Sequence, residues 1–85
     1  MKPRKLLERI LAGSLDVRFR EFCQLMEAFG FRLSRISGSH HIYTHSALPE
    51  LVNVPDVRGK AKPYQIRQFL KLVEEYNLTS ENGEQ

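Results

Sequence analysis

Three histidines lie within six residues, in the stretch ISGSHHIYTH that runs from Ile36 to His45, and the chain has no others. Imidazole groups bind metals and act as general acids or bases, because they titrate near pH ~6.5. The stretch therefore raises three possibilities. It could be a metal site, a catalytic site, or a set of polar side chains on a solvated strand.

The spacing of the histidines disfavours a metal site. On an extended strand His41 and His45 share a face, but four residues at ~3.3 Å each separate them by roughly 13 Å. Zinc ligands must each lie about 2 Å from the ion. No cysteine lies nearby, and no Asp or Glu occurs between Ile36 and Pro49. We therefore expect no metal and no other cofactor.

A Ser-His-acid triad also fits poorly, because Ser39 and His40 are neighbours that point to opposite faces of a strand. His40 begins the predicted strand directly after the Gly38-Ser39 turn, so we expect it at the rim of the sheet. There it is either a hydrogen-bonded, half-exposed histidine or a general acid/base that faces a phosphodiester. His45 lies at the far end of the strand, and we expect only a solvated side chain there, at the start of the loop.

Alternation along this strand predicts which side chains face the helices. Ile42 is the most apolar member, so we expect it to point toward the helices, with His40 and Thr44 on its side of the strand. The other three side chains would then lie on the opposite face: His41, Tyr43 and His45.

Basic residues concentrate in the middle of the chain. Residues 32–71 contain seven Lys and Arg against Glu50 and Asp56, within a net charge of +3 for the whole chain. A basic stripe on a small domain favours a polyanionic partner, usually nucleic acid, although it can also be a solvated face. The seven are Arg32, Arg35, Arg58, Lys60, Lys62, Arg67 and Lys71.

The apolar pattern predicts the elements that position these residues. A chain of 85 residues suits one domain, here residues 1–78, followed by a flexible tail over 79–85. Asp16 is a candidate N-cap for the second helix. We predict helices over 4–12, 17–29 and from Pro63 onward, strands over 31–37, 40–45 and 51–55, and an exposed basic loop over 56–62.

This order predicts an α+β fold, in which one face of a three-stranded antiparallel sheet is covered by helices. Cys23 lies on the apolar stripe of the second helix, which indicates a core residue rather than a nucleophile. One cysteine excludes an internal disulfide and fits a reducing cytoplasm. No apolar run is as long as a membrane span, so we expect a cytoplasmic protein with no membrane partner.

Several segments together resemble a known family. These segments are a helix that ends in Phe29-Gly30-Phe31, the stretch RISGSHHIYTH, a VNVP strand, and a basic loop that leads into a last helix. In them the chain resembles the HicA family of toxin-antitoxin mRNA interferases, over about residues 17–78. The stretch GKAKPYQIRQ resembles a longer subgroup that carries an extra leading helix. The resemblance implies a fold like a double-stranded-RNA-binding domain (α-β-β-β-α), RNA cleavage without a metal, and a HicB-type antitoxin that covers the catalytic histidine.

The resemblance also implies roles for individual residues. The family's catalytic histidine is the one directly after Gly-Ser, which is His40 here. His41 is the alternate on a different ground, because alternation places it with Tyr43 on the other face of the strand, where RNA could also lie. As a base, His40 would take the proton of an RNA 2′-hydroxyl, which would then attack the adjacent phosphorus. The alternatives are a non-catalytic RNA-binding module of this fold and a protein-interaction domain. RNA contacts are expected from Arg35, Gly38, Ser39, Arg58, Lys60, Lys62, Arg67 and Lys71.

Overall fold

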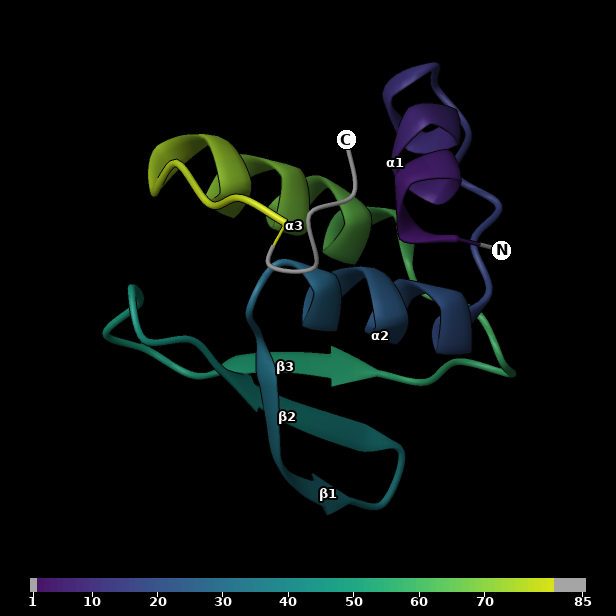
Figure 1. Cartoon of the computed structure of the whole chain (residues 1–85). Coiled ribbons are helices and arrows are strands. Elements are labelled where there is room, and N and C mark those ends of the chain that lie inside the picture. Colours follow the sequence, from purple (N-terminus) through teal and green to yellow (C-terminus); the bar gives the residue numbers. More distant parts are fainter. Residues whose placement is uncertain (1, 81–85) are drawn as a thin grey trace.

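The predicted order of helices and strands is confirmed by a computed structural model, which describes residues 2–80. No boundary that we predicted is off by more than two residues. Residues 79–80 follow the last helix without regular secondary structure, and the rest of the predicted tail lies outside the described residues. The elements are α1 (Pro3–Leu11), α2 (Phe19–Ala28), β1 (Arg32–Ser37), β2 (His40–Thr44), β3 (Val52–Pro55) and α3 (Pro63–Glu75) (Figure 1).

The three strands form one antiparallel sheet in the order β1-β2-β3, and the helices lie on one side of it (Figure 1). The α+β architecture expected from the sequence is therefore correct. We call the sheet surface that points away from the helices the outer face. No helix within residues 2–80 is long and apolar enough to cross a membrane.

The predicted faces of β2 are reversed. Tyr43 is only 1% exposed and pairs with the buried Val52, while His41 pairs with the fully buried Val54. These side chains point toward the helices, so His40 and Ile42 lie on the outer face. The reason is that Val52 and Val54 place their strand's apolar side inward, and antiparallel pairing makes the side chains opposite them share that side.

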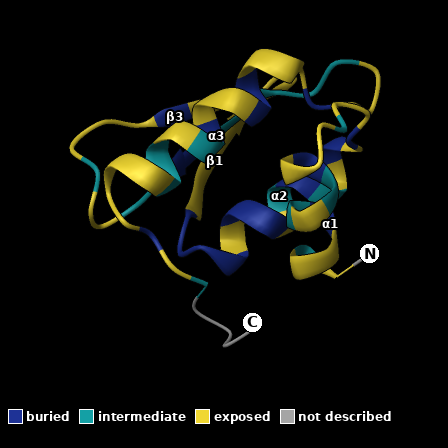
Figure 2. Cartoon of the chain, turned by 90° about the horizontal axis from the view of Figure 1, so that it is seen from above, coloured by how far each residue is buried: buried dark blue, intermediate teal, exposed yellow. Residues whose placement is uncertain are grey.

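Aromatic rings fill the space between the sheet and the helices. Phe69 of α3 makes edge-to-face contacts with Phe22 of α2 and with Phe29, directly after α2, with centroids 5.7 and 5.5 Å apart. The inward sides of α2 and α3 are correspondingly buried (Figure 2). Leu6 and Ile10 of α1 join this core, whereas Leu11, the last residue of α1, is 67% exposed.

Strand β1 lies outside the cover of the helices (Figure 1), and all six of its residues are exposed. It pairs with β2 along one side, and no other described strand pairs with its second side. A register shift between Leu33 and Arg35 interrupts the pairing at Ser34. Leu33 and Ile36 are consequently 44% and 55% exposed, although they lie on the inward face.

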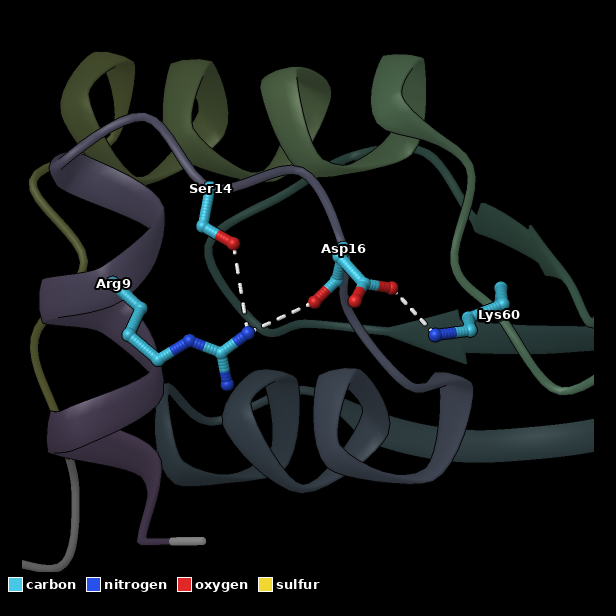
Figure 3. A network of polar contacts seen from close by, with 4 residues as sticks. All are labelled: Arg9, Ser14, Asp16 and Lys60. Carbon is cyan, nitrogen blue, oxygen red and sulfur yellow. Dashed lines mark hydrogen bonds and ion pairs between the residues drawn. The ribbon is translucent and has the colours of Figure 1, made fainter.

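The joint between α1 and α2 is held by the 56–62 loop, which lies about 40 residues further along the chain. The N-cap of α2 is Arg18, not Asp16 as expected, and its side chain makes no capping hydrogen bond. The Asp16 carboxylate instead forms an ion pair with Lys60 (Figure 3). Arg9 donates to the Asp16 carbonyl oxygen at 2.9 Å, so α1 and the 56–62 loop both contact this joint.

Candidate functional site

His40 is exposed on the outer face of the sheet, at the first position of β2. Its Nδ1 lies 3.0 Å from the amide oxygen Oδ1 of Asn53, on β3. The pairing register places Ser37 opposite His40 and Asn53 opposite Ile42, so all four side chains belong to the same face. His40 therefore meets solvent with its ring held from one side.

His41 occupies the opposite surface. Its ring packs edge-to-face against Phe19 of α2, with centroids 4.7 Å apart. Its Nδ1 is buried and has no hydrogen-bond partner among residues 2–80. A substrate on the outer face could not reach this ring without crossing the sheet.

His45 connects the end of β2 to the end of α2, which differs from the solvated position expected from the sequence. Its Nε2 lies 2.9 Å from the carbonyl oxygen of Phe29, and the backbone N–H of Ala47 donates to its Nδ1 at 3.0 Å. The ring also packs on Phe31, with centroids 4.9 Å apart. Both nitrogens are therefore occupied within the protein.

The turn before His40 leaves open space. Gly38 has a φ of +61°, in the left-handed region that favours glycine, and a Cβ added there would meet nothing within 4 Å. The carbonyl oxygen of Ser39 accepts the backbone N–H of Asp56 at 2.8 Å. The turn is thus anchored to the beginning of the basic loop while its outer side stays accessible.

The basic loop is more fixed than an exposed loop usually is. The backbone N–H of Phe19 donates to the carbonyl oxygen of Gly59 at 2.8 Å, and that of Ala61 donates to Val17 at 3.0 Å. The Lys60 ammonium lowers the pKa of Asp16, first through its hydrogen bond to the carboxylate and then through its charge. The charge of Lys60 is therefore partly compensated.

A groove of about 630 Å³ lies between β3 and α3, next to His40. Asn53 belongs both to this groove and to the contact with His40, so the two features adjoin. Arg67 and Lys71 lie one helical turn apart on its α3 wall. The lining residues are Leu51, Asn53, Tyr64, Gln65, Arg67, Gln68 and Lys71.

The predicted RNA-binding residues thus fall into three groups. Arg35, opposite Ile42, shares the outer face with His40, and Gly38 and Ser39 form the turn directly before His40. Arg67 and Lys71 line the groove, and the exposed residues Arg58, Lys60 and Lys62 belong to the loop before α3. Sequence reasoning missed Asn53 and Tyr64. The helical spacing of Tyr64, Arg67 and Lys71 is the signal that could have grouped Tyr64 with the two cations.

A comparison with protein families decides the class of the chain. The model described as "HicA toxin of bacterial toxin-antitoxin" matches residues 19–74, which is more than half of the chain. The chain belongs to the HicA toxin family. No curated protein and no solved structure matched it. A HicA toxin implies an antitoxin partner, and the matched segment of this one begins with α2, so α1 lies outside it.

The other candidate groups of this HicA toxin do not form a second reactive centre. Cys23 is half-buried against the core, and burial raises the pKa of its thiol, which disfavours the nucleophilic thiolate. Burial also raises the pKa of Tyr43, and the hydrogen bond between Tyr43 and Cys23 raises it further. Among the described residues, no three His, Cys, Asp or Glu side chains are grouped so that they could hold a metal ion.

Proposed function

We propose that this HicA toxin is a ribonuclease that cleaves mRNA with His40 as its general base. One observation supports this proposal above the others. Of the three histidines, His40 alone has its ring on the open outer face, while His41 packs on Phe19 and both nitrogens of His45 are occupied. An accessible imidazole on the same face as Arg35 suits proton transfer on a phosphodiester.

The proposed reaction uses the nucleophile that RNA carries. His40 takes the proton of a 2′-hydroxyl, whose oxygen attacks the adjacent phosphorus. The bond from phosphorus to the 5′-oxygen breaks, which leaves a 2′,3′-cyclic phosphate, and water gives the departing oxygen its proton. Arg35, on the same face, stabilises the charge on the phosphoryl oxygens. One general base contributes about 10²–10⁴-fold, so we expect a slow enzyme.

The substrate strand crosses the outer face in this proposal. Arg67 and Lys71 in the adjoining groove contact its phosphates, together with Arg58, Lys60 and Lys62 in the loop before α3. The antitoxin is of the HicB type and inhibits the toxin by covering the outer face, where it blocks access to His40.

Replacement of His40 tests the catalytic assignment. His40→Gln keeps a polar side chain of similar size but removes the titrating group, so cells that express it without antitoxin should grow normally and keep their mRNA. The purified variant should still bind RNA. Thr44→Val, on the same strand and face, is the matched control and should remain toxic.

Two other outcomes would replace the proposal. If His40→Gln stays toxic while His41→Gln is harmless, the base lies on the inward face. If the parent chain arrests growth and binds RNA without degrading it, the chain is a non-catalytic RNA-binding module.

Chelation tests whether cleavage needs a metal. We expect purified toxin to degrade RNA at an unchanged rate in excess EDTA, because a 2′-hydroxyl and an imidazole suffice for the proposed chemistry. Activity that stopped with EDTA and returned with zinc or manganese would show that the toxin is a metal-dependent nuclease.

A further inference from the structure

The contact between Asn53 and His40 distinguishes this site from a simple exposed histidine. Asn53 lies between two inward-pointing valines on β3, so its side chain is directed to the outer face. Its oxygen Oδ1 is 3.0 Å from Nδ1 of His40, across the two strands. Pairing with β2 fixes the backbone at both positions.

This contact decides which ring nitrogen carries the proton. An amide oxygen can only accept a hydrogen bond, so the proton between the two side chains belongs to Nδ1 of His40. A neutral imidazole has one N–H, which leaves Nε2 with a free lone pair. Residues 2–80 give Nε2 no hydrogen-bond partner. The nitrogen that can accept a proton is therefore the one open to a substrate.

We propose that Asn53 is a positioning residue, which holds His40 in the tautomer and orientation in which Nε2 is the base. This inference rests on the proposed function of His40. When Nε2 takes the proton of the 2′-hydroxyl, the ring becomes a cation and its Nδ1–H bond to Asn53 strengthens, because hydrogen bonds from charged donors are roughly twice as strong as neutral ones. The gain arises in the transition state, so it should affect kcat rather than KM.

The other groups around His40 do not replace this role. Ser37 and Arg35 from β1 and Pro55 from β3 lie on the same face. The side chains of Arg35 and Pro55 cannot accept a proton from Nδ1, and the Ser37 hydroxyl makes no hydrogen bond with the ring among residues 2–80. Asp56, the acidic residue that directly follows β3, uses its carboxylate to accept the backbone N–H of Gly59 at 2.7 Å. Asn53 is therefore the group that orients the ring.

Two substitutions of Asn53 separate positioning from mere structure. Asn53→Ala should lower kcat for cleavage of a short RNA about 10-fold with KM unchanged, because the transition-state bond is lost. Asn53→Asp should restore kcat, because a carboxylate accepts from the same Nδ1–H. It should also move the acid limb of the pH–rate profile to higher pH, since its charge stabilises the protonated ring. Gln24→Ala, at an exposed position of α2 on the helix side of the sheet, should leave both parameters and the profile unchanged.

Nitrogen NMR of the His40 ring gives a readout that does not depend on activity. We expect Nδ1 to carry the proton in the parent protein at neutral pH and the Nδ1–H form to decline in Asn53→Ala. An Asn53→Ala variant that cleaves at the parent rate with an unchanged ring spectrum would overturn the inference, even if His40→Gln is inactive. If the parent cleaves no RNA, the proposed function fails instead, and a ring protonated on Nε2 would still refute the contact.

Discussion

His40 begins strand β2, and His45 directly follows that strand. Their surroundings nevertheless give the two histidines different roles. The neighbours of His40 leave one nitrogen open, whereas those of His45 occupy both. A histidine whose two nitrogens are satisfied by backbone groups serves the fold rather than a reaction. Residue type alone does not separate these cases.

Loss of His45 should destabilise the fold. His45→Ala removes the donor to the Phe29 carbonyl oxygen and the ring contact with Phe31, so we expect the free energy of unfolding to fall by about 2 kcal/mol. Urea denaturation monitored by circular dichroism measures this change. His40→Ala, on the exposed face, is the control and should stay within about 0.5 kcal/mol of the parent. Equal midpoints for His45→Ala and the parent would contradict the structural role.

At the scale of elements, the joint between α1 and α2 and the loop before α3 depend on each other. Arg9 contacts the backbone of Asp16, whose carboxylate contacts Lys60 (Figure 3). The backbone bonds of Phe19 and Ala61 join the same two segments. Segments about 40 residues apart are therefore held as one unit.

The Asp16–Lys60 pair predicts a small dependence of stability on pH. Lys60 lowers the pKa of Asp16 below its ordinary value of 3.8. A lowered pKa adds stability above the unfolded value, and this contribution disappears as the pH falls through the lower folded value. Urea midpoints of the parent should thus exceed those of Asp16→Asn at pH 7, and the difference should shrink as the pH falls below 3.8. The difference should be slight because both side chains are exposed. A Glu50→Gln control should not show this convergence, and a gap that widens in acid would contradict the pairing.

The sequence predicted the elements well because their signals are local. The spacing of Phe22, Met26 and Phe29 marks a helix, and Gly38 marks a turn, without reference to the rest of the chain. The faces of β2 depend on its partner strand instead. Ile42 is more apolar than Tyr43, but Val52 and Val54 decide which side is buried. The contact between Asn53 and His40 could not be predicted for the same reason, because the pairing register of β2 and β3 brings together residues that are 13 positions apart.

At the scale of the whole molecule, the outer face and the groove beside α3 form the surface on which we expect RNA. Arg67→Ala with Lys71→Ala should lower the affinity for unrelated RNAs about equally. It should also flatten the salt dependence by ~1.4 units for two phosphate contacts on a single strand. Fluorescence anisotropy at several salt concentrations gives both quantities. Lys2→Ala with Lys5→Ala removes the same charge from the region of α1 and should leave the slope unchanged. Loss of discrimination between RNAs with an unchanged slope would contradict phosphate contacts.

The exposed strand β1 has a consequence for how copies of this toxin meet each other. An unpaired strand edge invites another strand to join it, and Leu33 and Ile36 add apolar surface there. The interruption at Ser34 and the like charges of Arg32 and Arg35 oppose such self-association, because two copies would repel edge to edge. Salt screens this repulsion and also weakens phosphate contacts. The salt concentration that releases RNA from the toxin is therefore also the concentration at which the edge of β1 is least protected from aggregation.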